Sequence, residues 1–360
     1  MLKISPANRR LAKALTPALG FAPEDGALGP IDLDLARYAH FRHRVAPLLH
    51  HAVATCGISA EEDAARFLER QAARNARRVL QQKAAVRRFG DALDRAGIGW
   101  LEVKGWHLGD SLYPAASLRH AKDVDLLIEP GRAEDAITLA AKLGYRGSQG
   151  GGNGETLDVE HSRQVLRYHR ETSIFDPASG AEIEIHAHLL SDAPPGWRDP
   201  PTSSSKEERS QTLRRPDYVL YLITHGTATG WKRMKWLCDL ALLASGVDCA
   251  TRKQAIALAR ELDGLPALCA SFDLLRELWP QATDGLWLPL IAPDECDAKT
   301  IRSHRAAFIR QLNEESEPSA PLRYARHLGL LRDPPVFGTR HPSFWRQLRR
   351  TFALRQLWRG

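Results

Sequence analysis

Apolar residues recur every three or four positions over residues 31–97, the spacing of one buried helix face. Pro30 stands before the first run, where helices often open. In the second run, Ser59 and Glu62 have the spacing of a capping box, in which each side chain caps the other's backbone N–H. Ala, Arg, Gln, Glu and Leu dominate that run until Gly97, and all favour helices. The pattern predicts a helical N-terminal region.

After residue 97 the pattern changes to short apolar or alternating runs bounded by turn residues, which is typical of strands. Four runs of this kind are residues 97–105, 122–130, 163–170 and 181–190. Helical patterns over residues 106–113 and 131–145 separate the first three. The order predicts an α+β fold with a small mixed sheet flanked by N- and C-terminal helical regions.

The remaining chain combines loops with further helical patterns. A glycine-rich stretch at 147–156 predicts a surface loop, and four helices are expected between residues 216 and 279. The basic, aromatic C-terminal segment is expected to dock on the body as a helix, with a membrane surface or a partner groove as alternatives. The predicted organisation is an N-terminal extension (1–30), a helical region (31–97), the sheet core (98–192), a Pro/Ser-rich linker (193–212), a C-terminal helical domain (213–335) and a basic amphipathic tail (336–360).

Composition narrows the class of protein. The formal net charge is +7, but arginines are spread along the chain and the only dense run is at the C-terminus, so nucleic-acid binding is not favoured. Five cysteines show no C-x-x-C spacing, which argues against a disulfide framework or a zinc site. No apolar run is long enough to span a membrane, and the N-terminus lacks the apolar region of a signal peptide. A cytoplasmic protein is expected.

Two aspartates carry the main chemical signal. Asp123 and Asp125 stand two residues apart on a predicted strand, so alternation places both side chains on one face. Adjacent carboxylates repel each other unless a cation lies between them, and Mg²⁺ prefers one or two carboxylates plus substrate phosphates. We therefore expect a metal site here, with Mn²⁺ as an alternative ion.

A third carboxylate would come from the acidic strand at 181–190. Glu184 is the candidate, and Glu182 is its competitor because it shares the same face. Three carboxylates can hold two ions that clamp the attacking and leaving oxygens of an in-line displacement. Glu184 would also draw the proton from an acceptor hydroxyl. His186 is expected beside the site, orienting Glu184.

Basic residues near the aspartates are candidates for phosphate binding. Lys104 and Gly105 stand at a strand-to-helix turn, where glycine allows close approach and the helix presents N–H groups to an anion. Arg119, in the turn before the aspartate strand, could contact a phosphate with two nitrogens. Lys235 could contact a nucleotide, although one solvated helix face explains it equally well. His225 is expected to pack between helices or to line the cleft.

Residues 100–146 resemble the core of an uncharacterised bacterial nucleotidyltransferase family of the polymerase-β-like nucleotidyltransferase superfamily. The matching positions are Lys104, Gly105, Tyr113, Pro114, Arg119, Asp123, Asp125, Gly144 and Tyr145. The likeness extends to the acidic strand, where it selects Glu184 and His186, and to a C-terminal helical motif with His225, Lys235, Trp236 and Asp239. Trp106 departs from the pattern, because the superfamily often has serine there.

The resemblance implies metal-dependent transfer of NMP from an NTP such as ATP to an acceptor hydroxyl, with release of pyrophosphate. The acceptor could be a sugar, a metabolite, a peptide or a protein side chain. Two alternatives remain open: a kinase that uses the same metals to direct attack at the γ-phosphorus, and a protein that binds a nucleotide or partner without turnover.

Overall fold

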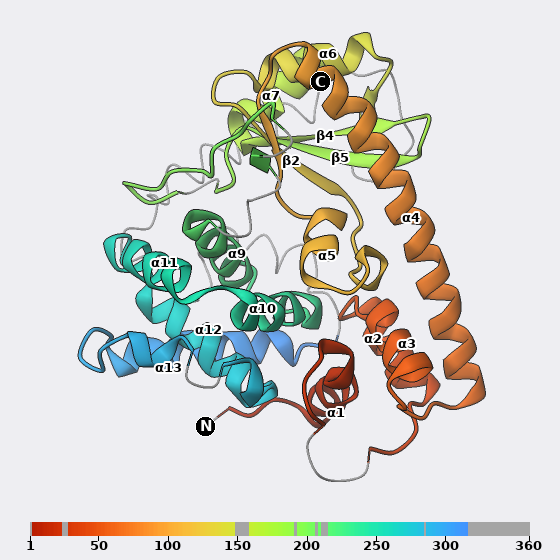
Figure 1. Ribbon diagram of the computed structural model, residues 1–360, viewed down its shortest axis with the longest axis vertical. Coiled ribbons are helices and arrows are strands. Elements are labelled where there is room, and N and C mark those ends of the chain that lie inside the picture. The colour runs from red at the N-terminus through yellow and green to blue at the C-terminus, as the bar shows by residue number, and fades with distance from the viewer. Residues whose placement is uncertain are drawn as a thin grey trace.

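A computed structural model shows an α+β protein in which helices flank one mixed sheet (Figure 1). The described residues are 2–23, 28–147, 158–190, 193–205, 208–209, 215–283 and 286–315. The α-helices are α1 (Pro6–Leu15), α2 (Leu33–Phe41), α3 (Ala46–Thr55), α4 (Glu62–Arg95), α5 (Trp106–Leu112), α6 (Ala133–Lys142), α7 (Val159–His169), α9 (Pro216–Ala228), α10 (Met234–Gly246), α11 (Cys249–Glu261), α12 (Leu265–Leu278) and α13 (Ala298–Leu312). Within these ranges, no helix is both long and apolar enough to cross a bilayer.

The sheet has the strand order β1-β2-β5-β4-β3. Its strands are β1 (Trp100–Glu102), β2 (Val124–Ile128), β3 (Arg146–Gly147), β4 (Glu171–Asp176) and β5 (Ala181–His186). The central pair, β2 and β5, is parallel, and every other neighbouring pair is antiparallel. The structure thus confirms the predicted mixed sheet and three of its predicted strands.

The two faces of the sheet differ in chemistry. On one face, Val124, Leu126 and Ile128 are buried in a hydrophobic cluster with residues of α4, α6 and α7. On the other face, Leu127 packs with Leu101 and with tyrosines from α9. Because side chains alternate along β2, Asp125 points to the α9 side, and the apolar residues around it fix the strand in the core.

The N- and C-terminal helices are packed together beside the sheet. Residues of α1 to α3 and of α9 to α13 form one hydrophobic cluster, although they come from opposite ends of the chain. In Figure 1 the long helix α4 runs from α2 and α3 to the sheet. The indole N–H of Trp279 in the cluster donates to the carbonyl of Ala12, at 3.1 Å. The two ends of the described chain are thereby joined in one helical body.

The strand prediction for residues 163–170 is wrong, because this segment belongs to α7. Asp158 caps the helix by accepting a hydrogen bond from His161 N, and Ser162 and Leu166 are its buried residues, one turn apart. The strand follows immediately as β4, whose buried positions alternate. The few apolar residues in this segment fit the spacing of a strand as well as that of a helix. The Asp158 cap favours the helix.

The capping box predicted at Ser59 and Glu62 is also wrong. Helix α4 begins at Glu62, and its N-cap residue, Glu61, makes no side-chain cap. Ile31 instead forms two backbone hydrogen bonds with this segment. Its N–H donates to the Ser59 carbonyl at 2.8 Å, and its carbonyl accepts from the Glu61 N–H at 2.9 Å. This extended pairing keeps Ser59 outside the helical turn. Likewise, α2 begins after an Asp32 cap rather than at Pro30.

The four predicted C-terminal helices are confirmed as α9 to α12, whereas α13 was not predicted. Nearly all of the predicted glycine loop, from residue 148 onward, and the whole basic tail lie outside the described residues.

Candidate functional site

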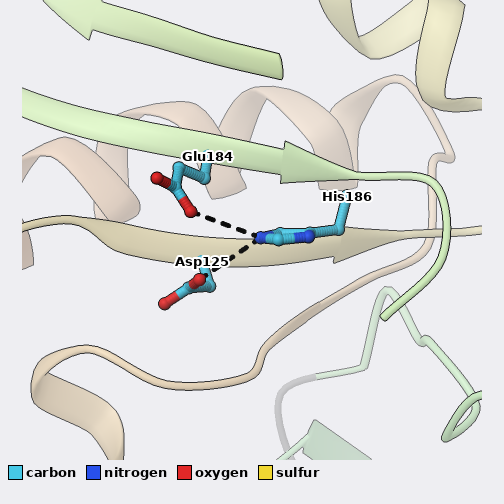
Figure 2. A group of neighbouring side chains, drawn as sticks. All are labelled: Asp125, Glu184 and His186. Atoms are coloured by element: carbon cyan, nitrogen blue, oxygen red, sulfur yellow. Dashed lines mark hydrogen bonds and ion pairs between the residues drawn. The ribbon is translucent and has the colours of Figure 1, made fainter. Parts of the chain in front are cut away.

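The parallel pairing of β2 and β5 places Asp125 directly beside Glu184. Their side chains lie close to the ring of His186, which follows Glu184 by two residues on β5 (Figure 2). His186 Nε2 lies 3.2 Å from Asp125 Oδ1 and 3.7 Å from Glu184 Oε2. The sheet register therefore brings two carboxylates and an imidazole to one point.

The charges of this group are strongly coupled. Burial and the nearby Asp125 and Asp123 carboxylates raise the pKa of Glu184 to about 7, against the opposing hydrogen bond of His186. Burial lowers the pKa of His186, but its hydrogen bonds to Asp125 and Glu184 outweigh this and raise it to about 9. At neutral pH, protonated His186 thus lies between the two acids as a cation.

Lys104 is a second cation on the same aspartate. Its Nζ lies 3.0 Å from Asp125 Oδ1, and only 14 % of the lysine side chain is exposed. Burial opposes the charge on Lys104, but Asp125 and Glu184 hold its pKa well above the ordinary value. Burial likewise opposes ionisation of Asp125, and Lys104 and His186 hold the pKa of that carboxyl well below its usual range.

The donor set suits a divalent cation. Asp125, Glu184 and His186 each offer one ligand atom, and these atoms lie within 4.8 Å of one another. Carboxylate oxygens are the ligands that Mg²⁺ and Mn²⁺ favour, and a neutral imidazole adds a nitrogen donor. Lys104 and His186 now balance the negative charge of the two carboxylates, and a bound metal ion would balance the same charge. The residues present therefore fit a metal.

The other two predicted acids are not members of this close group. Asp123 lies just before β2, is half-buried, and is not among the residues whose ligand atoms lie within 4.8 Å. Glu182 pairs instead with Lys122 at 3.1 Å, near the surface. Between the two acids predicted to compete, the register places Glu184 beside Asp125.

The Gly105 turn abuts the site, as expected, but its helix end is occupied. Gly105 has φ 74° and ψ −143°, a conformation that other residues avoid, and an added Cβ would lie 3.4 Å from Asp123 O. The N–H of His107 in the first turn of α5 donates to Glu102 Oε1 at 3.3 Å. Burial raises the pKa of Glu102 well above the ordinary value. A free helix terminus was expected here, and a buried acid is found instead.

Arg119 is buried against protein groups. Its Nε and Nη2 donate to both carboxylate oxygens of Asp239 at 2.9–3.1 Å, and its Nη1 donates to the Gly105 carbonyl at 2.9 Å. Tyr113 adds a hydrogen bond to Asp239 at 2.8 Å. Only 3 % of the Arg119 side chain is exposed. Arg119 therefore fastens the Gly105 turn to α10, and a phosphate contact would require these bonds to be exchanged.

Two predicted residues lie at the edge of the site. His225 on α9 lines a cavity of about 20 Å³ together with Lys104, Arg119 and Trp236. That volume holds about one water molecule. Burial and the nearby Lys104 lower the pKa of His225, which keeps its ring neutral. Lys235 on α10 donates to the carbonyl of His120 at 3.3 Å.

Sequence reasoning missed two residues in contact with the site. Tyr221 on α9 lies with its ring centre 5.9 Å from Lys104 Nζ. Glu171, the first residue of β4, lies 3.3 Å from His186 Nδ1. Correct placement of β4 would have predicted this contact. β4 and β5 are antiparallel, so the first residue of β4, Glu171, pairs with the last residue of β5, His186.

Comparison with known proteins gives one match. A family model described as "Uncharacterised nucleotidyltransferase" matches residues 30–280, which include the whole sheet and α2 to α12. No curated protein and no solved structure matches the chain.

Proposed function

Because the chain belongs to the uncharacterised nucleotidyltransferase family, we propose that it transfers NMP from an NTP to an acceptor hydroxyl and releases pyrophosphate. The observation that supports this most strongly is the register of β2 and β5, which sets Asp125 beside Glu184 with His186 in contact with both. Paired carboxylates on adjacent strands can hold the divalent ion that phosphoryl chemistry uses.

Asp125 and Glu184 would hold Mg²⁺ or Mn²⁺, with Asp123 joining them from just before the start of β2. His186 would either ligate the ion through a neutral ring nitrogen or orient Glu184, the role predicted for it from the sequence. The bound ion would neutralise phosphate charge and fix the α-phosphate. Lys104 is expected to move its charge from Asp125 towards the triphosphate when the ion binds.

The proposed chemistry is an in-line displacement. The acceptor oxygen forms a bond to the α-phosphorus, the bond from that phosphorus to the β-bridging oxygen breaks, and pyrophosphate departs with the bonding electrons. Glu184 would draw the hydroxyl proton from the acceptor. Gly105 and Lys235 would contact the nucleotide, and Arg119 would support it by holding Gly105 in place.

The position of a radioactive label tests this proposal. The protein is incubated with Mg²⁺, an NTP labelled on the α- or the γ-phosphate, and extract from its source cells. Asp125→Asn and Glu184→Gln are the test variants, because both keep the shape of the side chain. Glu261→Gln is the matched control, since Glu261 is exposed on α11.

We expect wild type and Glu261→Gln to move α-label to an acceptor, and both site variants to lose the transfer. Transfer of γ-label that the site variants lose would replace the proposal with a kinase. If neither label moves with any NTP, the protein is a binder rather than a transferase under these conditions, and the proposed function is rejected.

A further inference from the structure

Basic side chains converge beside the site from four separate parts of the chain. They are His40 on α2, Arg44 in the turn before α3, Arg78 on α4, His120 before β2 and Lys235 on α10. We call these five residues the basic cluster. They are not metal ligands, and the proposed chemistry so far uses only Lys235.

Direct contacts hold the basic cluster together. Arg78 Nη1 lies 3.4 Å from His120 Nε2, and the ring of His40 lies 6.5 Å from that of His120. Lys235 Nζ donates to the backbone carbonyl of His120 at 3.3 Å. The backbone of His43 accepts from Lys235 N, so the turn that carries Arg44 is tied to the start of α10. The fold itself therefore brings these basic side chains together.

Three members of the basic cluster are not paired with an acid in the part of the chain that the structure describes. Among the described residues, no carboxylate is bonded to Arg78, His120 or Lys235. The Nδ1 atoms of His40 and His120 are buried and have no hydrogen-bond partner in the described structure. Buried polar atoms are normally paired, so these two nitrogens point to a missing ligand.

The arrangement is electrostatically costly as it stands. Burial and the nearby Arg119 and Arg44 lower the pKa of Lys235 to about 7, although Asp239 and Asp123 act against the shift. Burial and the charges of Lys235, Arg44 and Arg78 also lower the pKa of His120. Arg44 has φ 57°, a strained value for a residue with a side chain. An anion among these groups would relieve their mutual repulsion.

We propose that the basic cluster is a phosphate-binding subsite for a substrate of the transfer reaction. Clustered arginine and lysine side chains are the usual means of holding phosphate oxygens. His120 stands three residues before Asp123, and Lys235 is within electrostatic reach of that aspartate, so the phosphate would lie next to the metal site. The inference rests on the proposed function for the identity of the substrate. The phosphate is either a terminal one of the NTP or one carried by the acceptor.

The test uses inorganic pyrophosphate as the probe, with EDTA present so that no metal ion at the carboxylates can hold the pyrophosphate. Isothermal titration calorimetry compares wild type, Lys235→Met and Arg78→Gln. Lys253→Met is the matched control, because Lys253 is exposed on α11, outside the cluster. Circular dichroism confirms that each variant is folded, and Arg78→Gln keeps the test valid if Lys235→Met does not fold.

We expect wild type and Lys253→Met to bind pyrophosphate equally, and each cluster variant to bind about tenfold more weakly, the usual effect of losing one charged hydrogen bond. The proposal is overturned if wild type shows no binding at millimolar pyrophosphate, or if Lys235→Met and Arg78→Gln bind as well as wild type.

Titration with ATP and AMP distinguishes the two phosphate sources. If Lys235→Met weakens ATP but not AMP, the cluster holds terminal phosphates of the nucleotide. If it weakens pyrophosphate but leaves ATP unchanged, the phosphate belongs to the acceptor, and the subsite still stands. Wild-type pyrophosphate binding without any transfer of α-label would reject the proposed function and leave the subsite intact.

Discussion

Removing Asp239 should destabilise the protein severely. The carboxylate accepts three hydrogen bonds from Arg119 and one from Tyr113, all within the interior. In Asp239→Ala the guanidinium keeps only its bond to Gly105 and cannot lose its charge. Breaking a buried ion pair by removing one partner costs about 3–5 kcal/mol. Since a folded domain is stable by only about 5–15 kcal/mol, this loss brings the variant close to unfolding.

Urea denaturation followed by circular dichroism measures the effect. We expect the free energy of unfolding to fall by about 3–5 kcal/mol in Asp239→Ala. In the control Asp135→Ala, which removes an exposed ion pair to Arg132, it should fall by less than about 1 kcal/mol. The double variant Arg119→Met/Asp239→Leu should recover much of the loss, because it removes both charges together.

A loss below about 1 kcal/mol in Asp239→Ala would refute the assigned role of Arg119 as the residue that fastens Gly105 to α10. The competing interpretation, a direct phosphate contact, makes the opposite prediction. Under it, Arg119→Met would weaken ATP binding while the free energy of unfolding stayed unchanged.

Three further predictions follow from local geometry and charge. Lys235 has a folded-state pKa of about 7 against an ordinary 10.5, so the unfolded state binds more protons between these values and stability rises with pH there. Lys235→Met should therefore be more stable than wild type at pH 7 in urea denaturation, with an advantage that shrinks towards pH 10.5; a constant difference would contradict the assigned pKa. Gly105→Ala should lose about 1–3 kcal/mol of stability and should weaken ATP binding by calorimetry, because its φ of 74° disfavours a side chain; full stability would show that the turn adapts. Gly226→Ala would place a Cβ 2.1 Å from the Trp231 ring and should lower thermal stability by about 1–3 kcal/mol, and an unchanged melting temperature would contradict the packing there.

Much of the sheet could be predicted from local pattern alone. The apolar run around Asp125 and the alternation around Glu184 each predict a strand, and both strands are found. What local pattern cannot give is which strands pair and in what register. Only the parallel pairing of β2 with β5 decides that Glu184, rather than Glu182, lies beside Asp125.

The roles of the basic residues could not be predicted, because they depend on contacts between distant segments. Arg119 is 120 residues from Asp239 in the sequence. The residues next to Arg119 in the sequence do not show that its charge is paired with a carboxylate. Lys104 likewise contacts Asp125 only through the pairing of β1 with β2. A charged residue near a predicted site can either hold the site together or bind its ligand. Only the tertiary contacts of that residue show which role it has.

Metal binding tests the central claim most directly. Electron paramagnetic resonance of Mn²⁺, titrated into the protein without nucleotide, measures the fraction of ion that the protein binds, because a triphosphate would itself chelate Mn²⁺. We expect wild type and Glu261→Gln to bind Mn²⁺ alike, and Asp125→Asn and Glu184→Gln to lose this binding. Binding by Asp125→Asn with the affinity of wild type would contradict the assignment of a metal site to this pair of strands.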